Sequence, residues 1–225
     1  MEEAASIPLV ALTAWQALVE KAKLKKGQKV FIQAGSGGVQ ALQLDVTNAE
    51  QIAAAAHQAA DVTLVINNAG IAQPGGFLAQ DSDAVARRIF ETNFFGMLNM
   101  SKAFAPVLKA NGGGALLNVL SVASWINGSE LAAYSASKSA AWSLTNALRH
   151  ELAAQKTQVL GLHMAYVDTD LTRGFDVQKS SAEEIVQRAL DGLEAGVDEV
   201  LADALTQQVR QGLAAPRPVY LPQAN

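Results

Sequence analysis

Cysteine is absent from the 225 residues of this chain, which excludes disulfide bonds and thiolate metal sites. The three histidines, His57, His150 and His163, are scattered and lack a metal-binding spacing, so we expect no metal site and interpret each as structural or exposed. No apolar run approaches the roughly 20 residues that span a bilayer. The Met-Glu-Glu start also lacks the basic segment of a secretory signal. These absences predict a cytoplasmic protein that does not bind membranes.

A strong charge of either sign is also missing, since 17 Lys and Arg oppose 21 Asp and Glu for a net charge of −4. This balance gives no reason to expect nucleic acid as a partner. The local lysine cluster at Lys21–Lys29 is interpreted as a solvated helix end and loop. Prolines are few, 6 against 17 glycines, which favours tight turns over a disordered chain. The length fits one domain with a single large core.

Apolar strands alternate with helical periodicity along the chain. This pattern predicts an α/β fold, a Rossmann-like doubly wound parallel sheet in a three-layer αβα arrangement. Strands are expected at 29–33, 41–46, 62–66, 115–120 and 157–162. Helices are expected at 9–23, 49–60 (capped by Asn48), 82–109, 133–154 and 182–195, with a possible extended end at 217–222. With no repeat or rich linker, residues 1–225 are predicted to form a single domain.

The strongest chemical signal is the sequence Tyr134-Ser-Ala-Ser-Lys138 near the start of a predicted helix. Residues four apart lie on one helical face, so the ammonium can sit beside the phenol. A nearby cation favours the phenolate and lowers the phenol pKa from about 10 toward the range useful for acid–base catalysis. On its own the spacing also fits a surface pair on a helix.

Two further residues support a site. Ser121 closes the strand that precedes this helix, so its hydroxyl is expected at the carboxyl edge of the sheet, where open α/β sheets bind ligands. Asn93 lies in a predicted helix after the loop Asn67-Asn-Ala-Gly70.

From about Gln40 to its C-terminal region the chain resembles the short-chain dehydrogenase/reductase family. The matching pieces come in the family's order and spacing: Asp45-Val46, Asn67-Asn-Ala-Gly70, Asn93, Ser121, and Tyr134 with Lys138. The resemblance implies an oxidoreductase that moves hydride between NADP or NAD, with NADP slightly favoured, and a small carbonyl or secondary alcohol substrate.

The resemblance also implies a role for each matching residue. Tyr134 would give a proton to the carbonyl oxygen or take it from the alcohol, and Ser121 would hydrogen-bond the same oxygen. Lys138 would lower the tyrosine pKa and bind the cofactor ribose, and Asn93 would hold a water linking Lys138 to solvent. In this part of the chain the residues expected to bind the cofactor are Asp45, Val46, Asn68, Ala69, Gly70, Tyr134, Lys138, Val167 and Thr169.

One segment departs from the family. His163–Thr169 matches a stretch that usually reads Pro-Gly-x-Val-x-Thr near the nicotinamide, and Met164 and Ala165 replace the Pro-Gly. This substitution alters the backbone freedom there. Four apolar residues could form a substrate wall, although ordinary packing fits them equally well: Trp125, Ile126, Leu171 and Phe175.

The first 39 residues resemble instead the start of the nucleotide domain of medium-chain, quinone-oxidoreductase-like enzymes, so the chain reads as a natural or engineered fusion joined near Val39-Gln40. The helix, second strand and next helix of a dinucleotide fold are then missing or replaced. The loop Gly35, Ser36, Gly37 and Gly38 could still offer backbone N–H groups to phosphate, or be only a tight connection. The predicted helix at 9–23 could fill the vacant place on the sheet.

An alternative function therefore stays open: a catalytically silent fusion or scaffold that retains the fold but has impaired cofactor binding. A quinone-reducing enzyme is a weaker reading, because the rest of that catalytic domain is lacking. The family resemblance further implies a homodimer or homotetramer formed through the helices expected at 84–109 and 134–154.

Overall fold

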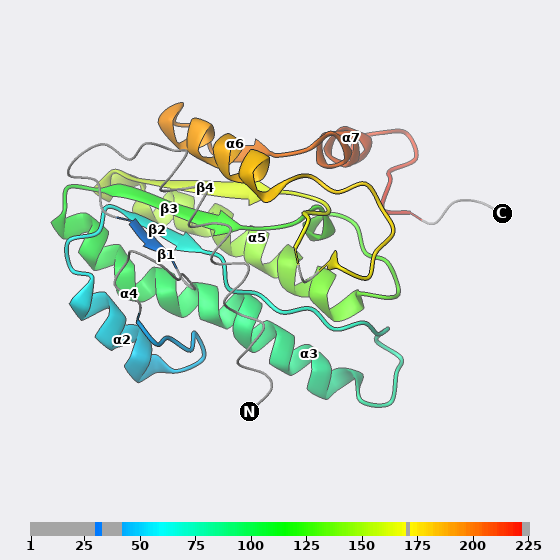
Figure 1. Cartoon of the computed structure of the whole chain (residues 1–225), viewed down its shortest axis with the longest axis horizontal. Helices are drawn as coiled ribbons and strands as arrows, with labels where there is room; N and C mark the ends of the chain where they lie inside the picture. Colours follow the sequence, from blue (N-terminus) through cyan, green and yellow to red (C-terminus); the bar gives the residue numbers. More distant parts are fainter. Residues whose placement is uncertain (1–29, 33–41, 170–171, 222–225) are drawn as a thin grey trace.

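A parallel β-sheet forms the centre of the computed structural model, which describes residues 30–32, 42–169 and 172–221. Within these residues the sheet has five strands in the order β1-β2-β3-β4-β5, so neighbours in the sheet are also neighbours along the chain (Figure 1). The strands are β1 (Val30–Ile32), β2 (Leu64–Asn67), β3 (Gly114–Val119), β4 (Thr157–His163) and β5 (Glu199–Leu201). The carboxyl ends of β2, β3 and β4 therefore meet at one edge, where Asn67 pairs with Asn118 and Asn118 with Gly161.

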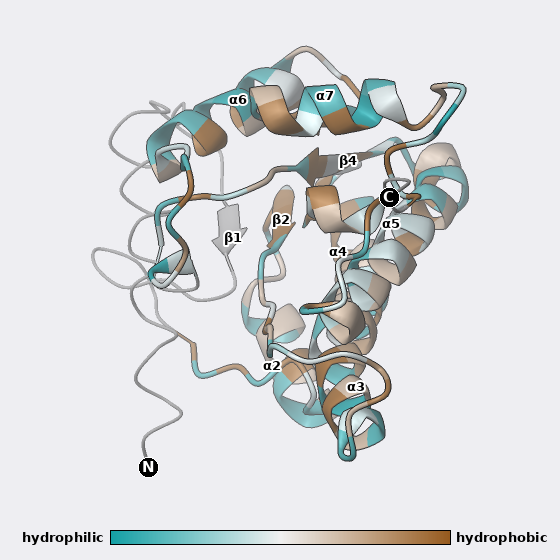
Figure 2. Cartoon of the chain, turned by 90° about the vertical axis from the view of Figure 1, so that its right-hand side faces the viewer, coloured by the Kyte–Doolittle hydropathy of each residue, from teal (hydrophilic) through white to brown (hydrophobic). Residues whose placement is uncertain are grey.

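Helices cover both faces of this sheet, which confirms the predicted three layers. Figures 1 and 2 show α6 and α7 on one side and the remaining helices on the other. The helices are α2 (Ala49–Gln58), α3 (Ser82–Phe90), α4 (Met97–Ala110), α5 (Ala132–Leu152), α6 (Ala182–Glu194) and α7 (Ala204–Gly212), with a π-helical segment (Glu91–Gly96) between α3 and α4 and short 3₁₀ turns at Val122–Ser124 and Ala153–Gln155. None of the helices in the described residues has the length and apolarity needed to cross a membrane.

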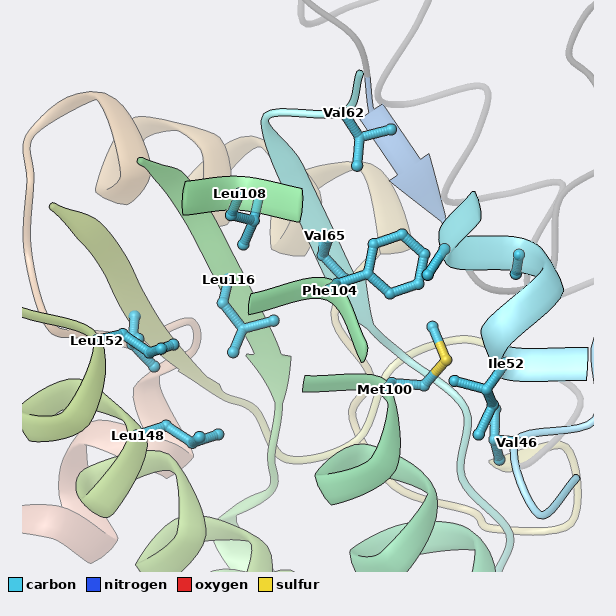
Figure 3. Packing of buried hydrophobic residues seen from close by; sticks show 13 residues of the cluster. Val46, Ile52, Val62, Val65, Met100, Phe104, Leu108, Leu116, Leu148 and Leu152 are labelled. Carbon is cyan, nitrogen blue, oxygen red and sulfur yellow. The ribbon is translucent and has the colours of Figure 1, made fainter. Parts of the chain in front are cut away.

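Each face of the sheet has its own apolar core. Adjacent residues of β2 point to opposite faces: Val65 packs with α2, α4 and α5, whereas Ile66 packs with α6. Figure 3 shows the larger core, in which Phe104 of α4 lies against Val65 and Met100 lies near Ile52 of α2. Burial on both faces explains why these strands are apolar runs rather than alternating patterns.

The last connection of the sheet differs from those before it. Each successive strand along the chain is added on the same side of the previous one in the sheet. The helix α6, which connects β4 to β5, nevertheless lies on the face opposite to that of α2, α4 and α5. A connection that advances the same way over the opposite face has the opposite hand. This crossover carries the chain from the end of β4 around to β5 and α7, which pack beside the carboxyl edge of β3 and β4.

Most of the predicted elements in the described residues are present, including the Asn48 cap, whose Oδ1 accepts from Glu50 N and Gln51 N at 3.0 and 3.1 Å. The predicted strand at 41–46 is wrong over its described part, 42–46, which has no strand. There Asp45 Oδ1 accepts from both Thr47 N and Thr47 Oγ1 at 2.8 Å, so its side chain forms a local turn in place of sheet pairing.

The C-terminal prediction is also wrong. Residues 217–221 form bends and turns, since Val219 N bonds to Gly212 O at 3.2 Å and folds the chain back on α7. The sequence patterns missed β5 and α7, both of which are short. The helix predicted at 9–23 lies outside the described residues.

Candidate active site

Ser121 and Tyr134 meet at the carboxyl edge of the sheet. Ser121 comes just after β3 and caps the 3₁₀ turn at Val122–Ser124, where its Oγ accepts from Ala123 N at 3.1 Å. Tyr134 lies in the first turn of α5, and its phenol hydrogen-bonds the Ser121 side chain. The turn that follows β3 therefore places a hydroxyl against a phenol, as the order of strand and helix predicted.

The pKa of Tyr134 departs from the sequence-based expectation. We expected a value below the ordinary one, because of the ammonium one helical turn away. In the structure burial raises the pKa of the phenol, and only the hydrogen bond from Ser121 acts in the opposite direction. The phenol is therefore protonated at neutral pH, which is the form that can donate a proton.

Lys138 is buried next to this pair, with 4% of its surface exposed. Its Nζ donates to Val119 O at 2.9 Å and lies 5.8 Å from the centroid of the Tyr134 ring. Burial lowers the pKa of this ammonium from 10.5 to about 8. The spacing of four residues thus brings lysine and tyrosine to one face, as predicted, and the strand end at Val119 holds the ammonium over the ring.

Asn93 lies in the π-helical segment and is 1% exposed. Its Oδ1 accepts from Ile71 N at 2.8 Å, and its Nδ2 donates to Ile71 O at 2.9 Å and to Ser137 Oγ at 3.0 Å. Ser137 Oγ in turn donates to Tyr134 O at 2.7 Å. Both side-chain N–H groups of Asn93 are engaged in this network, so this side chain ties the loop after β2 to the helix that carries Tyr134 and has no N–H left to donate to a water.

Gly70 follows β2 and lies next to two polar side chains of the site. A Cβ built on this exposed glycine would lie 3.5 Å from Asn93 Oδ1 and 3.6 Å from Lys138 Nζ. The loop after β2 thus passes close to an ammonium donor and an amide oxygen acceptor. Such a donor and acceptor fit the two hydroxyls of a ribose, which is the part of the cofactor that the resemblance assigned to Lys138.

A chain of buried polar side chains at the ends of β2 and β3 was missed by the sequence reasoning. Asn67 Nδ2 donates to Asn118 Oδ1 at 2.8 Å and to Ser101 Oγ at 3.1 Å, and Asn118 Nδ2 donates to Thr145 Oγ1 at 2.9 Å. This chain of buried side chains crosses β2 and β3 and fixes α4 and α5 at the site edge. The sequence did carry a signal for this network: Asn67 ends one apolar strand and Asn118 lies in the next.

The other predicted cofactor residues fall into three groups. Asn68 and Ala69 follow β2 and are half-buried. Asp45 is exposed, while Val46 is buried against the π-helical segment, where a Cβ on Gly96 would come within 2.7 Å of its Cγ2. Gly35, Ser36, Gly37 and Gly38 lie outside the described residues.

The segment that lacks Pro-Gly also reaches the site. Val122 N donates to Met164 O at 2.9 Å, which extends the pairing of β3 and β4 past Ser121. Ala165 N donates to Asp203 Oδ2 at 2.8 Å, so the N-terminal end of α7 anchors this segment in place of a proline ring. Val167, bridged to Ser180, and Thr169 follow half-buried.

The residues proposed for a substrate wall are placed differently from one another. Trp125 is buried against His163, whereas Phe175 contacts Tyr166 and is 39% exposed. Leu171 lies outside the described residues.

Comparison with known proteins identifies the family. The model of the family described as short chain dehydrogenase matches residues 10–180. The chain belongs to the short-chain dehydrogenase family. The family match therefore starts well before Gln40, where the sequence alone placed the beginning of the resemblance.

Several short-chain dehydrogenases and related proteins are similar to this chain. Galactitol 2-dehydrogenase (L-tagatose-forming) of Cereibacter sphaeroides is 40% identical over 133 residues, covering 57% of this chain and 52% of that protein. The 7alpha-hydroxysteroid dehydrogenase of Escherichia coli K12 is 30% identical over 143 residues, covering 62% of this chain and 55% of that protein. The chain spans about half, or less, of the length of the curated relatives it matches.

A solved short chain dehydrogenase from Burkholderia cenocepacia J2315, in complex with NADP, is 35% identical to this chain, with a TM-score of 0.84. The superposition covers 94% of this chain and 91% of that one. This solved structure and the chain therefore share the short-chain dehydrogenase fold.

Proposed function

We propose that this chain is an NAD(P)-dependent oxidoreductase that interconverts a small carbonyl compound and its secondary alcohol. The observation that carries the proposal is the hydrogen bond between Ser121 and Tyr134 beside the buried ammonium of Lys138. Membership of the short-chain dehydrogenase family supports it, as do the names of relatives that are dehydrogenases.

In the proposed reduction Tyr134 is the general acid. A protonated phenol hydrogen-bonds the substrate carbonyl oxygen and transfers its proton as negative charge develops there. Ser121 donates to the same oxygen and fixes its position, which stabilises that charge. Lys138 stabilises the phenolate left behind, because its ammonium lies over the tyrosine ring, 5.8 Å from the centroid. In the oxidation direction the same groups act in reverse.

Asn93 is proposed to support this arrangement through its ties to Ile71 and Ser137. The family resemblance assigns a relay water to Asn93. Because both side-chain N–H groups of Asn93 are already engaged, this water must bind another group of the residue. A π-helical segment leaves backbone carbonyl groups with altered partners, and such segments are frequent at functional sites. We place the relay water at the Asn93 backbone.

When bound, the reduced cofactor, NADPH or NADH, would supply the hydride for reduction, and the oxidised cofactor would accept it in the reverse direction. We propose that Lys138, Tyr134, Asn68, Ala69 and Gly70 hold its nicotinamide-ribose end, with Val167 and Thr169 on the β4 side. Asp45 and Val46 are proposed for the adenine end. Solved relatives are in complex with NADP and with NAD, which supports either cofactor. Gly35, Ser36, Gly37 and Gly38 stay the proposed phosphate loop.

Isothermal titration with NADPH and NADH, followed by a screen of ketones and aldehydes, tests the proposal. We expect binding of at least one cofactor and turnover that Tyr134→Phe lowers by roughly 10²-fold to 10⁴-fold. Tyr220→Phe, which replaces an exposed tyrosine, is the matched control and should leave turnover unchanged. Unchanged turnover in Tyr134→Phe would overturn the assignment. Failure to bind either cofactor at millimolar concentration would favour the silent scaffold.

Three further features of the chain are part of the same proposal. Residues 1–225 form one domain, in which residues 1–39, which resemble a medium-chain enzyme, are fused to a short-chain dehydrogenase core. The protein is cytoplasmic. Two or four copies associate through α3–α4 and α5; Phe95 of the π-helical segment, 42% exposed, lies on that helix pair. Light scattering after gel filtration would give a monomer mass if this assembly is wrong.

A further inference from the structure

His163 is buried behind the proposed active site. It ends β4, it is 0% exposed, and its ring forms a cluster with two tryptophans that also contact each other. Trp125 stacks on it with centroids 4.1 Å apart and an interplanar angle of 23°, and Trp142 meets its edge at 6.3 Å. These contacts fix both the position and the plane of the imidazole.

Both ring nitrogens of His163 face oxygen acceptors. Nδ1 lies 3.4 Å from the backbone oxygen of Ser121, and Nε2 lies 3.4 Å from Glu199 Oε1. Each nitrogen therefore lies within reach of one oxygen, the first on the main chain just after β3 and the second on the carboxylate of β5. The histidine thus links the main chain of the proposed catalytic serine to a carboxylate of β5.

The carboxylate of Glu199 is itself held by other side chains. Trp142 Nε1 donates to Oε1 at 2.8 Å, and Arg210 of α7 donates to Oε2 at 3.2 Å. The Arg210 guanidinium also lies 5.0 Å from the Trp125 ring and 5.6 Å from the Trp142 ring. Within the part of the chain that the structure describes, the charged groups around His163 are therefore Glu199 from β5 and, beyond it, Arg210 from α7.

We propose that His163 is a positioning residue for Ser121: its ring, clamped by Trp125 and Trp142 and anchored on Glu199, holds the Ser121 main chain so that the hydroxyl stays on the Tyr134 phenol. Ser121 follows β3 in a turn whose 3₁₀ segment is only three residues long. The backbone oxygen of Ser121 contacts Nδ1 of His163, and Val122 N donates to Met164 O at 2.9 Å. The C-terminal β5–α7 unit thereby supports the active-site turn.

This proposal rests on the proposed function for its kinetic readout, and a double-mutant cycle tests it. His163→Phe keeps the ring and its stacking but removes both nitrogens. We expect it to lower kcat on the order of 10-fold to 100-fold in the wild-type background. In a Ser121→Ala background, where there is no hydroxyl to position, it should lower kcat less than about 2-fold. A merely structural histidine would lower kcat by the same factor in both backgrounds, which would overturn the proposal.

A readout independent of turnover separates this test from the proposed function. The phenol of Tyr134 is titrated by its absorbance in the absence of substrate, with Tyr134→Phe subtracted. We expect His163→Phe to raise the Tyr134 pKa in the wild-type background and to leave it unchanged in the Ser121→Ala background. An unchanged pKa in the wild-type background would overturn the proposal even if the chain has no turnover.

Two variants complete the design. His150→Phe, at an exposed position of α5, is the matched substitution and should change neither readout. If His163→Phe does not fold, His163→Gln replaces it in both backgrounds, because an amide keeps one donor near the same place. His163→Gln should then lower kcat by a larger factor in the wild-type background than in the Ser121→Ala background. Equal factors in the two backgrounds would overturn the proposal.

Discussion

The phenol of Tyr134 accepts its only pKa-lowering hydrogen bond from Ser121, a residue at the end of β3, while the phenol itself belongs to α5. Strand end and helix start thus define one functional pair. The strength of that pair depends on how the turn between them is held.

Removal of the Ser121 hydroxyl should make the phenol a weaker acid. The hydrogen bond from Ser121 lowers the Tyr134 pKa against the larger effect of burial, so Ser121→Ala should raise that pKa. Turnover should fall on the order of 10²-fold, as when one donor to a developing oxyanion is lost. An absorbance titration of the phenolate and steady-state kinetics measure both. Ser129→Ala, at an exposed position, is the control, and a lowered Tyr134 pKa in Ser121→Ala would contradict the expectation.

Lys138→Met should abolish turnover yet stabilise the fold at neutral pH. Burial lowers the lysine pKa from 10.5 to about 8. Below pH 8 both folded and unfolded chains carry the charge, and the folded chain bears its full burial cost, about 3 kcal/mol at most. Between pH 8 and 10.5 the folded chain loses the proton first, so the cost declines as pH rises.

Urea unfolding at pH 7 and pH 10 checks this prediction. The free energy of unfolding of Lys138→Met should exceed that of the wild type at pH 7, and the difference should shrink at pH 10. Lys102→Met, at an exposed position of α4, should show no such trend. A destabilised Lys138→Met at pH 7 would mean that the bond to Val119 O outweighs the burial cost.

Glu199→Gln should destabilise the fold at pH 7 by about 1–3 kcal/mol. The pKa of this carboxyl is lowered from 4.5 to about 2, chiefly by the hydrogen bond with His163, and further by Trp142 and Arg210. A lowered carboxyl pKa gives stability that is complete above pH 4.5 and is lost as pH falls toward 2. The difference between variant and wild type in urea should therefore narrow at pH 3. Exposed Glu194→Gln is the control, and a constant difference across this range would refute the linkage.

Gly96→Ala should cost about 1–3 kcal/mol, because the added Cβ would come within 2.7 Å of Val46 Cγ2. The valine is β-branched and has little freedom to turn away. In a Val46→Ala background the same change should be neutral or stabilising, since the opposing methyl groups are gone. Gly128→Ala, which meets nothing within 4 Å, is the comparison variant. Equal costs in both backgrounds would show that the packing of Val46 on the π-helical segment is not the cause.

Local chemistry made much of the site predictable from the sequence. The spacing of Tyr134 and Lys138 places them on one helical face whatever the rest of the chain does. Ser121 follows the mostly apolar stretch 115–120, which predicts a strand, so its place at the carboxyl edge could be derived. The Asn48 cap was likewise predictable, because its hydrogen bonds are made only with the first residues of the helix that follows it.

The parts that could not be predicted depend on contacts between distant segments. His163 looked like an isolated histidine, since Glu199 and Arg210 reach it only after the chain has passed over the opposite face of the sheet. The direction of the Tyr134 pKa was wrong because burial, which no spacing reveals, outweighs its neighbours. The strand expected at 41–46 failed because apolar alternation there competes with the turn made by the Asp45 side chain.

The π-helical segment makes chain length itself part of the site. Between Phe90 and Met97 the helix is wider than the α-helices on either side, so the two flanking helices are rotationally out of step. Deleting Thr92 would let α3 and α4 merge into one regular rod and turn one of them by roughly 100° about the axis. Asn93 would then swing away from Ile71 and Ser137, so the count of residues in this stretch is constrained as tightly as any side chain within it.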